Sequence, residues 1–383
     1  MSPRTTGASP GGGGELLSPR HPLLVVVGSG GVGKTTLAAA LGISSARRGD
    51  DTLVMTFDPS LRLKDALGVG EEARERAVPV DLPSAGDGEG AVGRLDASLL
   101  DARRTFDRLV ARYAPDPEAR DRILGNRFYE HLSGNLAGIL EYMAVERLWE
   151  VAREGSYDRV VLDTPPTRQA LDFLEAPGRI VGFLESGALK IALRPWFDAA
   201  GRLRGASRLG PLGRGFERFL DEMVGLDLLR DMAEFFGAFE PLYEGFRERA
   251  REVEALLHSE ETLFVLVAGP GEERVADTLF FARRLEEAGY RLGPVVVNRV
   301  HPVAQGDPPP LPDDPAAFAE GAPPLDGRAL LAWLGARDRR GVERLRNLLG
   351  PGQPLAELPL LPAEPTGLAA LHELGRDLLE RLG

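Results

Sequence analysis

Cysteine is absent from this chain of 383 residues, and its absence excludes several kinds of chemistry at once. Without thiols the protein can form no disulfide, no iron–sulfur cluster, no thiolate zinc site and no cysteine nucleophile. Long hydrophobic runs are missing as well, since no apolar stretch approaches the roughly 20 residues that span a bilayer as a helix. Basic residues are outnumbered, with 46 Lys and Arg against 58 Asp and Glu and a net charge of −12. This acidity argues against binding to nucleic acid or to an anionic membrane surface.

The N-terminal segment lacks the continuous apolar core of a secretory signal. It is rich in Gly, Pro and Ser, which predicts a flexible tail over residues 1–20. Without a signal or a spanning segment, the expectation is a cytoplasmic protein with no stable membrane insertion. The remaining residues, 21–383, are expected to form one domain with insertions.

Short apolar runs alternate with helical patterns along the chain. The runs that predict strands are 23–27, 52–57, 92–95, 159–162, 262–268 and 294–298. Helical patterns cover 34–48 and most of 98–154, where Pro115 and Pro117 break them. This alternation predicts an α/β fold with a doubly wound, mainly parallel sheet. Two segments interrupt it, a helical insertion over 176–258 and a mobile loop rich in Pro and Gly over 302–325.

A glycine-rich loop lies between the first predicted strand and the first predicted helix. Its sequence, GSGGVGKT over residues 28–35, fits the pattern G-x-x-x-x-G-K-[ST]. The glycines let backbone N–H groups turn toward phosphate oxygens, and the following helix adds the positive end of its dipole. Lys34, one of three lysines in the chain, is expected on the β- and γ-phosphates, with the Thr35 hydroxyl on Mg²⁺. The predicted ATP-binding residues of this loop are Gly28, Ser29, Gly30, Gly31, Val32, Gly33, Lys34, Thr35 and Thr36.

An aspartate follows each of two predicted strands. Asp58 comes after 52–57, and Asp163 comes after 159–162. The carboxyl ends of strands in an open α/β sheet face the ligand crevice, where a carboxylate can hold Mg²⁺ through water or orient an attacking water. Alone, either residue is more often a helix N-cap or a turn residue. Beside a phosphate-binding loop, the functional interpretation is favoured for both.

These motifs resemble the ArsA/Get-type ATPases, within the deviant Walker A class of P-loop ATPases. The matching segments are residues 28–36, Asp58-Pro59-Ser60, Glu141-Tyr142-Met143-Ala144, Asp163-Thr164-Pro165-Pro166-Thr167, Asn298 and Pro359-Leu360-Leu361-Pro362. The resemblance covers most of the chain and implies a P-loop NTPase fold that hydrolyses ATP with Mg²⁺. It also implies a homodimer, or a heterodimer with a paralogous ATPase, that closes around two ATP molecules.

The resemblance also implies roles for single residues. Asp58 would orient or activate the hydrolytic water, beside Lys34 as the second catalytic residue. Asp163 would assist Mg²⁺, through water, opposite the direct ligand Thr35. Asn298 would hydrogen-bond adenine. The base pocket would be lined by the segment that contains Pro359 and Pro362.

The chain departs from the family pattern at three points. The lysine that usually follows the first glycine, and that reaches the phosphates of the partner subunit, is replaced by Ser29. Either an arginine takes over its role, or a paralogous subunit supplies the lysine. The chain also lacks the cysteines with which arsenite pumps bind the metalloid, and the Cys-x-x-Cys zinc clamp of many tail-anchored-protein-targeting relatives.

An aromatic stripe in the helical insertion bears on what the ATPase serves. Its members recur at helical spacing: Leu228, Met232, Phe235, Phe236, Phe239, Leu242, Tyr243 and Phe246. In the targeting relatives this region forms an apolar groove for a client, although such a stripe is more often core. The favoured interpretation is an ATP-driven switch for a protein client or membrane partner. The alternatives are a subunit that energises anion export, a ParA/MinD-like positioning ATPase, and a non-hydrolysing regulatory partner.

Overall fold

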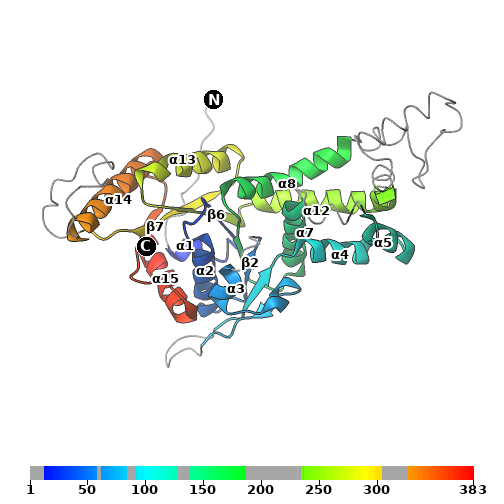
Figure 1. Ribbon diagram of the computed structural model, residues 1–383, viewed down its shortest axis with the longest axis horizontal. Coiled ribbons are helices and arrows are strands. Elements are labelled where there is room, and N and C mark those ends of the chain that lie inside the picture. The colour runs from blue at the N-terminus through cyan, green and yellow to red at the C-terminus, as the bar shows by residue number, and fades with distance from the viewer. Residues whose placement is uncertain are drawn as a thin grey trace, which may run out of the picture. The chain divides into compact units, whose positions relative to one another are not determined.

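The computed structural model divides the chain into two units (Figure 1). Unit 1 contains Met1–Leu99, Ser156–Ala170 and Leu257–Gly383, and unit 2 contains Leu100–Gly155 and Leu171–Leu256. The residues that the structure describes are 13–57, 62–83, 92–127, 129, 139–186, 231, 234–235, 237–303 and 327–383.

A sheet of eight strands forms the centre of the described part of unit 1, in the order β3-β4-β2-β5-β1-β6-β7-β8. The strands are β1 (Leu23–Gly28), β2 (Thr52–Thr56), β3 (Val78–Pro79), β4 (Leu95–Leu99), β5 (Arg159–Asp163), β6 (Thr262–Ala268), β7 (Leu292–Val300) and β8 (Leu355–Pro359). All neighbouring pairs are parallel except β3 with β4. Strands β1, β2, β5 and β6 are buried along their whole length, which explains their nearly continuous apolar sequences. The predicted α/β fold with a mainly parallel sheet is confirmed.

Helices cover both faces of this sheet. They are α1 (Gly13–Leu16), α2 (Lys34–Arg47), α3 (Arg62–Leu67), α13 (Glu272–Glu287), α14 (Gly327–Leu349) and α15 (Gly367–Leu382), with a 3₁₀ turn η1 (Glu71–Arg74). In Figure 1, α13 lies above β6 and β7, whereas α2 and α15 lie below them. Among the described elements, α13 packs against α14 and α2 packs against α15. This is the layered arrangement of a doubly wound fold.

Helix α2 packs against the sheet and against its neighbour α15, and it is buried along most of its length. Its buried residues are Lys34, Leu37, Ala38, Ala39, Ala40, Leu41, Gly42, Ile43, Ser44, Ser45 and Ala46. Gly375 of α15 brings the two backbones together, because a Cβ at this position would lie 2.2 Å from Ser44 Oγ and 2.6 Å from the Ala40 carbonyl oxygen. Interiors are close-packed, so α2 has little room to shift.

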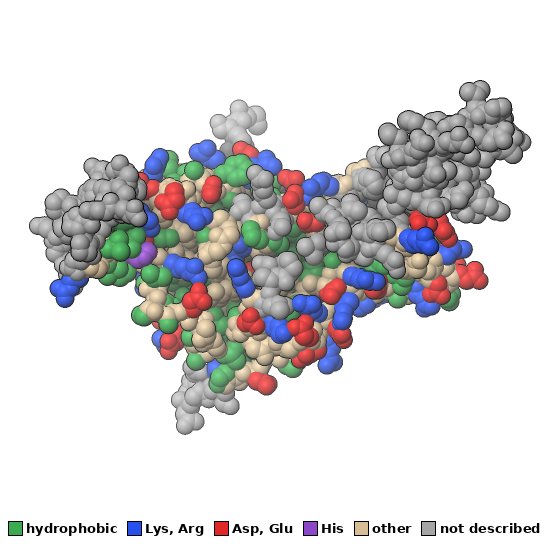
Figure 2. Space-filling model, viewed as in Figure 1, with side chains coloured by type: hydrophobic (Ala, Val, Ile, Leu, Met, Phe, Trp, Pro, Cys, Tyr) green, Lys and Arg blue, Asp and Glu red, His purple; other side chains and the backbone are tan. Residues whose placement is uncertain are grey.

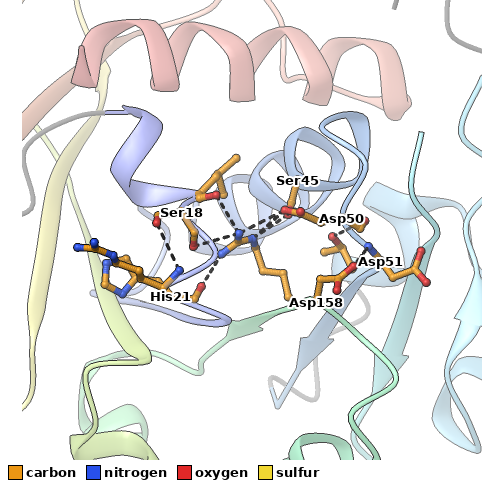
Figure 3. Close-up of polar contacts among 10 residues, drawn as sticks. Ser18, His21, Ser45, Asp50, Asp51 and Asp158 are labelled. Atoms are coloured by element: carbon orange, nitrogen blue, oxygen red, sulfur yellow. Dashed lines mark hydrogen bonds and ion pairs between the residues drawn. The ribbon is translucent and has the colours of Figure 1, made fainter. Parts of the chain in front are cut away.

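The first described residues of the chain are bound at the amino end of β5, whereas Asp163 lies at its carboxyl end. Arg159, at the first position of β5, is 1% exposed, and its Nη2 donates to the Leu17 carbonyl oxygen (2.9 Å) and to Asp50 Oδ2 (3.2 Å). Ser18, His21, Ser45 and Asp50 gather in the same polar cluster (Figure 3). Within the predicted tail 1–20, the structure therefore places residues 13–20 in the fold, with Leu16 and Leu17 buried, whereas residues 1–12 lie outside the described residues.

The strands also differ in part from the sequence-based expectation. The strand predicted over 92–95 instead runs from Leu95 to Leu99, where Asp96 and Ser98 are buried despite their polarity. β3 and β8 were not predicted, because each is short and only partly apolar. Of the predicted loop 302–325, all but the first two residues lie outside the described residues.

Unit 2 is helical throughout its described part. It contains α4 (Ala102–Tyr113), α5 (Pro117–Leu124), α7 (Ile139–Glu154), most of α8 (Thr167–Ser186), the 3₁₀ turn η2 (Glu240–Leu242) and most of α12 (Tyr243–His258). Helix α4 ends before Pro115 and α5 begins at Pro117 behind the Asp116 cap, as the prolines predict. The unit takes in residues 100–155 as well as the predicted insertion 176–258, so the helical part is larger than expected. No helix among the described residues is both long and apolar enough to cross a membrane.

Four of the five described members of the aromatic stripe are core residues of unit 2, and the fifth, Tyr243, is partly exposed. Phe235, Phe239, Leu242 and Phe246 are all buried, and Phe239 stacks on Phe106 with ring centroids 5.9 Å apart. Leu228, Met232 and Phe236 lie outside the described residues. For the four buried members, the packing interpretation of the stripe holds.

A buried ion pair joins α7 to α12 in the same unit. Arg249 Nε lies 2.6 Å from Glu146 Oε2, with side chains 7% and 2% exposed, and the Tyr142 hydroxyl donates to the other oxygen of Glu146. Burial raises the pKa of the Glu146 carboxyl above its ordinary value, while the bond to Arg249 opposes that rise. The segment Glu141–Ala144 that resembles the ATPase family therefore supplies a partner to a buried charge.

Candidate functional site

The glycine-rich loop, residues 28–35, connects the end of β1 to the start of α2. Gly33 occupies the N-cap position of α2 with φ +96°, in the left-handed region that favours glycine. A Cβ at Gly33 would also lie 2.4 Å from Asn298 Nδ2. The last glycine of the motif is therefore required both by the backbone turn and by the approach of β7.

Lys34 and Thr35 are the first two residues of α2. Lys34 is 6% exposed, and its Nζ donates to the Ser29 carbonyl oxygen at 3.0 Å, across the loop. The Thr35 hydroxyl donates to Asp163 Oδ2 at 2.8 Å. The amino end of a helix favours negative charge, so these two side chains stand where an anion is stabilised.

Asp163 ends β5, between β1 and β2, and is fully buried. Its Oδ2 accepts hydrogen bonds from Thr35 and from Thr56 Oγ1 (2.9 Å), the residue directly opposite on β2. Next to it, the Thr164 hydroxyl donates to the Val26 carbonyl oxygen (2.8 Å), which ties the segment after β5 to β1. Thr56 was not singled out from the sequence. The sequence feature that marks Thr56 is its position near the end of a predicted strand. Its pairing with Asp163 depends on the register of β2 with β5.

Asp58 lies outside the described residues, so the structure places no contact of its carboxylate. The neighbouring described residue, Phe57, donates its backbone N–H to the Asp163 carbonyl oxygen at 3.2 Å. Phe57, the residue directly before Asp58, therefore lies at the same edge of the sheet as Asp163.

Two successive residues near the end of β7 contact the glycine-rich loop. Asn298 Nδ2 donates to the Val32 carbonyl oxygen at 2.8 Å, and Arg299 Nη1 donates to the Gly31 carbonyl oxygen at 3.1 Å. Asn298 is among the residues predicted from the sequence. Arg299 is not, because no local pattern distinguishes it from the many other arginines of the chain.

A cavity of about 680 Å³ opens beside the loop, and we call it the loop cavity. Its lining includes the predicted residues Gly31, Gly33, Lys34, Thr35, Thr36, Asn298 and Pro359. The other lining residues are Arg62, Asp65, Ala66, Pro166, Arg299, Leu360, Leu361, Ala363, Glu364, Pro365, Thr366 and Leu374. Pro362 lies between two lining residues without lining the cavity itself. The structure thus brings the glycine-rich loop, α3, the end of β7 and the segment after β8 around one space.

The charges that line the cavity are mixed. Lys34, Arg62 and Arg299 are cationic, whereas Asp65 and Glu364 are acidic. Figure 2 shows basic and acidic side chains interspersed over the described surface of the face in view. No group of three or more His, Asp or Glu side chains that could hold a metal occurs among the described residues. A divalent cation at Thr35 and Asp163 would therefore take its remaining oxygen ligands from water or from a phosphate, as Mg²⁺ commonly does.

Comparisons with known proteins agree with this arrangement. The family described as "Anion-transporting ATPase" matches residues 21–311, which is more than half of the chain. A Streptomyces coelicolor protein, "Uncharacterized protein SCO2128", is 29% identical over 328 residues, covering 84% of this chain and 71% of that protein. The arsenical pump-driving ATPase of Acidiphilium multivorum is 26% identical over 372 residues, covering 94% of this chain and 50% of that protein. ATPase get3 of Neurospora crassa is 26% identical over 280 residues, 72% of each chain.

The family match includes the glycine-rich loop and strands β1, β2, β5, β6 and β7, and it contains the lining residues of the loop cavity from Gly31 to Arg299. The fold is that of a P-loop NTPase, with the phosphate loop and Asp163 at the carboxyl edge of a mainly parallel sheet. On both grounds, the chain belongs to the ArsA family of anion-transporting ATPases.

Proposed function

We propose that this chain binds Mg·ATP in the loop cavity and hydrolyses it to ADP and phosphate. The observation that carries the proposal is the grouping of three side chains at the amino end of α2. Lys34 and Thr35 open the helix, and the Asp163 carboxylate lies 2.8 Å from the Thr35 hydroxyl. A cation, a hydroxyl and a carboxylate at a helix N-terminus are the groups with which P-loop enzymes hold a polyphosphate and its metal ion.

The size and chemistry of the loop cavity fit these ligands. Its volume of about 680 Å³ lies within the roughly 300–1,000 Å³ usual for small-molecule sites. Thr35 lines the cavity, and Asp163, which does not line it, accepts the Thr35 hydroxyl; both offer the oxygen ligands that Mg²⁺ prefers. Pro359, Leu360 and Leu361 provide an apolar wall away from the charged end, suited to the face of a base.

Each residue then has a defined task. Lys34 neutralises charge on the β- and γ-phosphates, while the backbone N–H groups of the loop hold phosphate oxygens. Thr35 binds Mg²⁺ directly and Asp163 assists through water, the metal supplying further neutralisation of phosphate charge. The two threonine hydroxyls that donate to Asp163 Oδ2 keep its carboxylate oriented toward this position. Asp58 orients or activates the attacking water.

The base is proposed to lie beside Asn298, within the wall formed by the segment from Pro359 to Pro362. Asn298 already gives one N–H to the Val32 carbonyl oxygen, and its amide has a second N–H and an oxygen for adenine. An apolar wall with few polar groups is the usual construction of such a pocket.

Binding of ATP is proposed to close a dimer around the nucleotide. Ser29 takes the place of the lysine that in the family reaches the phosphates of the partner subunit. Either Arg62, which lines the same cavity, contributes the missing positive charge, or a paralogous subunit brings a lysine in a heterodimer.

Dimer closure is proposed to act on a protein client or on a membrane partner. The buried Phe235, Phe239 and Phe246 are unavailable to that client, so it would bind elsewhere. The family description and the arsenical pump-driving relative favour a second candidate, the energising of anion export. The cysteine-free chain excludes the thiolate route to arsenite, so this candidate requires another anion or another ligand set.

ATP binding and turnover by the purified protein test the proposal. Lys34→Ala is expected to lower ATP affinity by about 100-fold or more, because a charge near phosphate is worth several kcal/mol in a partly buried site. Asp58→Asn is expected to bind ATP normally and to turn it over about 100-fold more slowly. The matched control is Lys64→Ala, since Lys64 pairs with Glu71 and does not line the cavity. Submicromolar ATP affinity in Lys34→Ala would contradict the site.

The mass of the wild-type chain and of Ser29→Lys, with and without Mg·ATP, tests the dimer in the same preparation. Self-sufficient closure predicts an ATP-dependent dimer for the wild type, with faster turnover in Ser29→Lys. A wild-type chain that binds ATP yet stays monomeric and inactive indicates the regulatory partner instead.

A further inference from the structure

β7 departs from regular strand geometry just before it ends. Its pairing with β8 shifts register between Val297 and Val300, which places a β-bulge at Asn298 and Arg299. Arg299 has φ +65° and is the single non-glycine residue with positive φ in the described part of the chain. The left-handed region is unfavourable for a residue with a Cβ, so the surrounding structure must hold Arg299 there.

The bulge changes where two neighbouring side chains point. In a regular strand, successive side chains project to opposite faces of the sheet. Here Asn298 and Arg299 both reach the glycine-rich loop, one at the Val32 carbonyl oxygen (2.8 Å) and the other at the Gly31 carbonyl oxygen (3.1 Å). The kinked backbone therefore serves to bring two consecutive donors to two consecutive loop carbonyls.

The chain on the far side of the kink is fixed by its own contacts. The Leu360 N–H donates to the Val300 carbonyl oxygen at 2.8 Å. His301 donates its backbone N–H to Asp338 Oδ2 at 3.0 Å, and its Nδ1 lies 2.7 Å from the same oxygen of this fully buried aspartate. Unfavourable backbone conformations that neighbours over-determine in this way concentrate at functional sites.

The hydrogen bond from Arg299 acts on the part of the loop that would hold phosphate. A peptide unit is planar and trans, so its carbonyl and its N–H point in opposite directions. Holding the Gly31 carbonyl toward β7 therefore fixes the Val32 N–H in the opposite direction. In the same way, Asn298 fixes the Gly33 N–H through the Val32 carbonyl. N–H groups of such loops are the ones that cradle the α- and β-phosphates.

We propose that Arg299 is a positioning residue for the nucleotide phosphates, acting through the Gly31–Val32 peptide. This inference rests on the proposed binding of ATP in the loop cavity. The second contact of Arg299, with Glu364 at 3.6 Å, joins side chains that are 48% and 86% exposed. An ion pair so exposed contributes little, which leaves the loop carbonyl as the contact that matters.

Arg299→Gly isolates this role from a structural one. Glycine accepts φ +65° without strain, so the variant loses the guanidinium while the kink stays favourable. Calorimetric titration with Mg·ATP, Mg·ADP and adenosine is the measurement. Affinity for both phosphorylated ligands is expected to fall about tenfold, as for loss of one charged hydrogen bond that orders the loop. Affinity for adenosine is expected to stay unchanged.

Three comparisons separate the outcomes. Arg299→Lys is expected to recover part of the lost affinity, because lysine keeps a charged donor. Arg381→Ala is a matched loss of a surface arginine, paired with Asp377 at 2.7 Å on α15, and is expected to bind ATP like the wild type. The melting temperature of unliganded Arg299→Gly is expected to equal or exceed that of the wild type.

Unchanged ATP and ADP affinity in Arg299→Gly overturns the inference, and so does an equal loss for adenosine, which would place Arg299 at the base. A wild-type chain that does not bind Mg·ATP instead overturns the proposed function.

Discussion

The buried pair of Glu146 and Arg249 permits a prediction whose size follows from the structure. Replacing Arg249 by Met removes the cation and leaves a carboxyl that is 2% exposed without its counter-charge. Breaking one side of a buried ion pair typically costs about 3–5 kcal/mol of unfolding free energy, because the remaining charge is uncompensated. We expect a loss of this size near neutral pH.

The loss should depend on pH in a defined direction. Burial already raises the pKa of the Glu146 carboxyl, and Arg249 opposes that rise. Without Arg249 the pKa in the folded state rises further above its value in the unfolded chain. A raised carboxyl pKa means that the folded state binds the proton more tightly, so stability falls as pH rises through the folded pKa. The destabilisation should therefore be smaller near pH 5 than near pH 8, by up to about 1.4 kcal/mol for each pH unit titrated.

Urea denaturation at the two pH values, followed by tryptophan fluorescence, measures this effect. Trp149 is a local probe, since the Arg249 guanidinium lies 5.6 Å from its ring centre. The matched control is the double variant Glu146→Gln with Arg249→Met, which has no buried charge and should be more stable than Arg249→Met at the higher pH. A loss below about 1 kcal/mol, or an equal loss at both pH values, would refute the assignment of a buried charged pair.

Two further substitutions test the loop and the start of the chain. Gly33→Ala places a Cβ 2.4 Å from Asn298 Nδ2 in a backbone with φ +96°, so we expect at least about a tenfold loss of ATP affinity, measured by calorimetry; wild-type affinity would mean that the loop adjusts freely. Arg159→Met removes the buried cation beside Asp50, which keeps only neutral donors such as the Ser45 hydroxyl (2.6 Å), and the donor to the Leu17 carbonyl, so we expect about 3 kcal/mol or more of lost stability in urea; a loss below about 1 kcal/mol would show that the cluster contributes little.

Much of the loop cavity was predictable because its components are local in sequence. The glycine-rich loop, Lys34 and Thr35 are adjacent, and the pattern G-x-x-x-x-G-K-[ST] carries its own physical reason. Asp163 was predictable from its place after an apolar strand, since strand ends of a parallel sheet meet at one edge. The pairing of Asp163 with Thr56 needed the register between β5 and β2, which the sequence does not state.

Arg299 and Arg159 illustrate what the sequence could not reveal. The conformation of Arg299 depends on the shifted pairing of β7 with β8, a strand too short and too polar to be recognised beforehand. Arg159 stood inside an apolar run and gave no sign that it would be buried, because its partners Leu17 and Asp50 lie far away in the chain. In both cases the function of an arginine is set by tertiary neighbours rather than by local pattern.

The core also shows which part of the protein is free to respond to a ligand. Helix α2 carries Lys34 and Thr35, yet the close approach of Gly375 fixes it against the neighbouring helix α15. Interiors this tightly packed resist continuous deformation, so binding at the tip of α2 should leave the helix in place. The end of the cavity beside Lys34 and Thr35, where the phosphates are proposed to bind, is therefore expected to stay in place. Any movement caused by the proposed binding of ATP is therefore expected in the chain outside this packed layer.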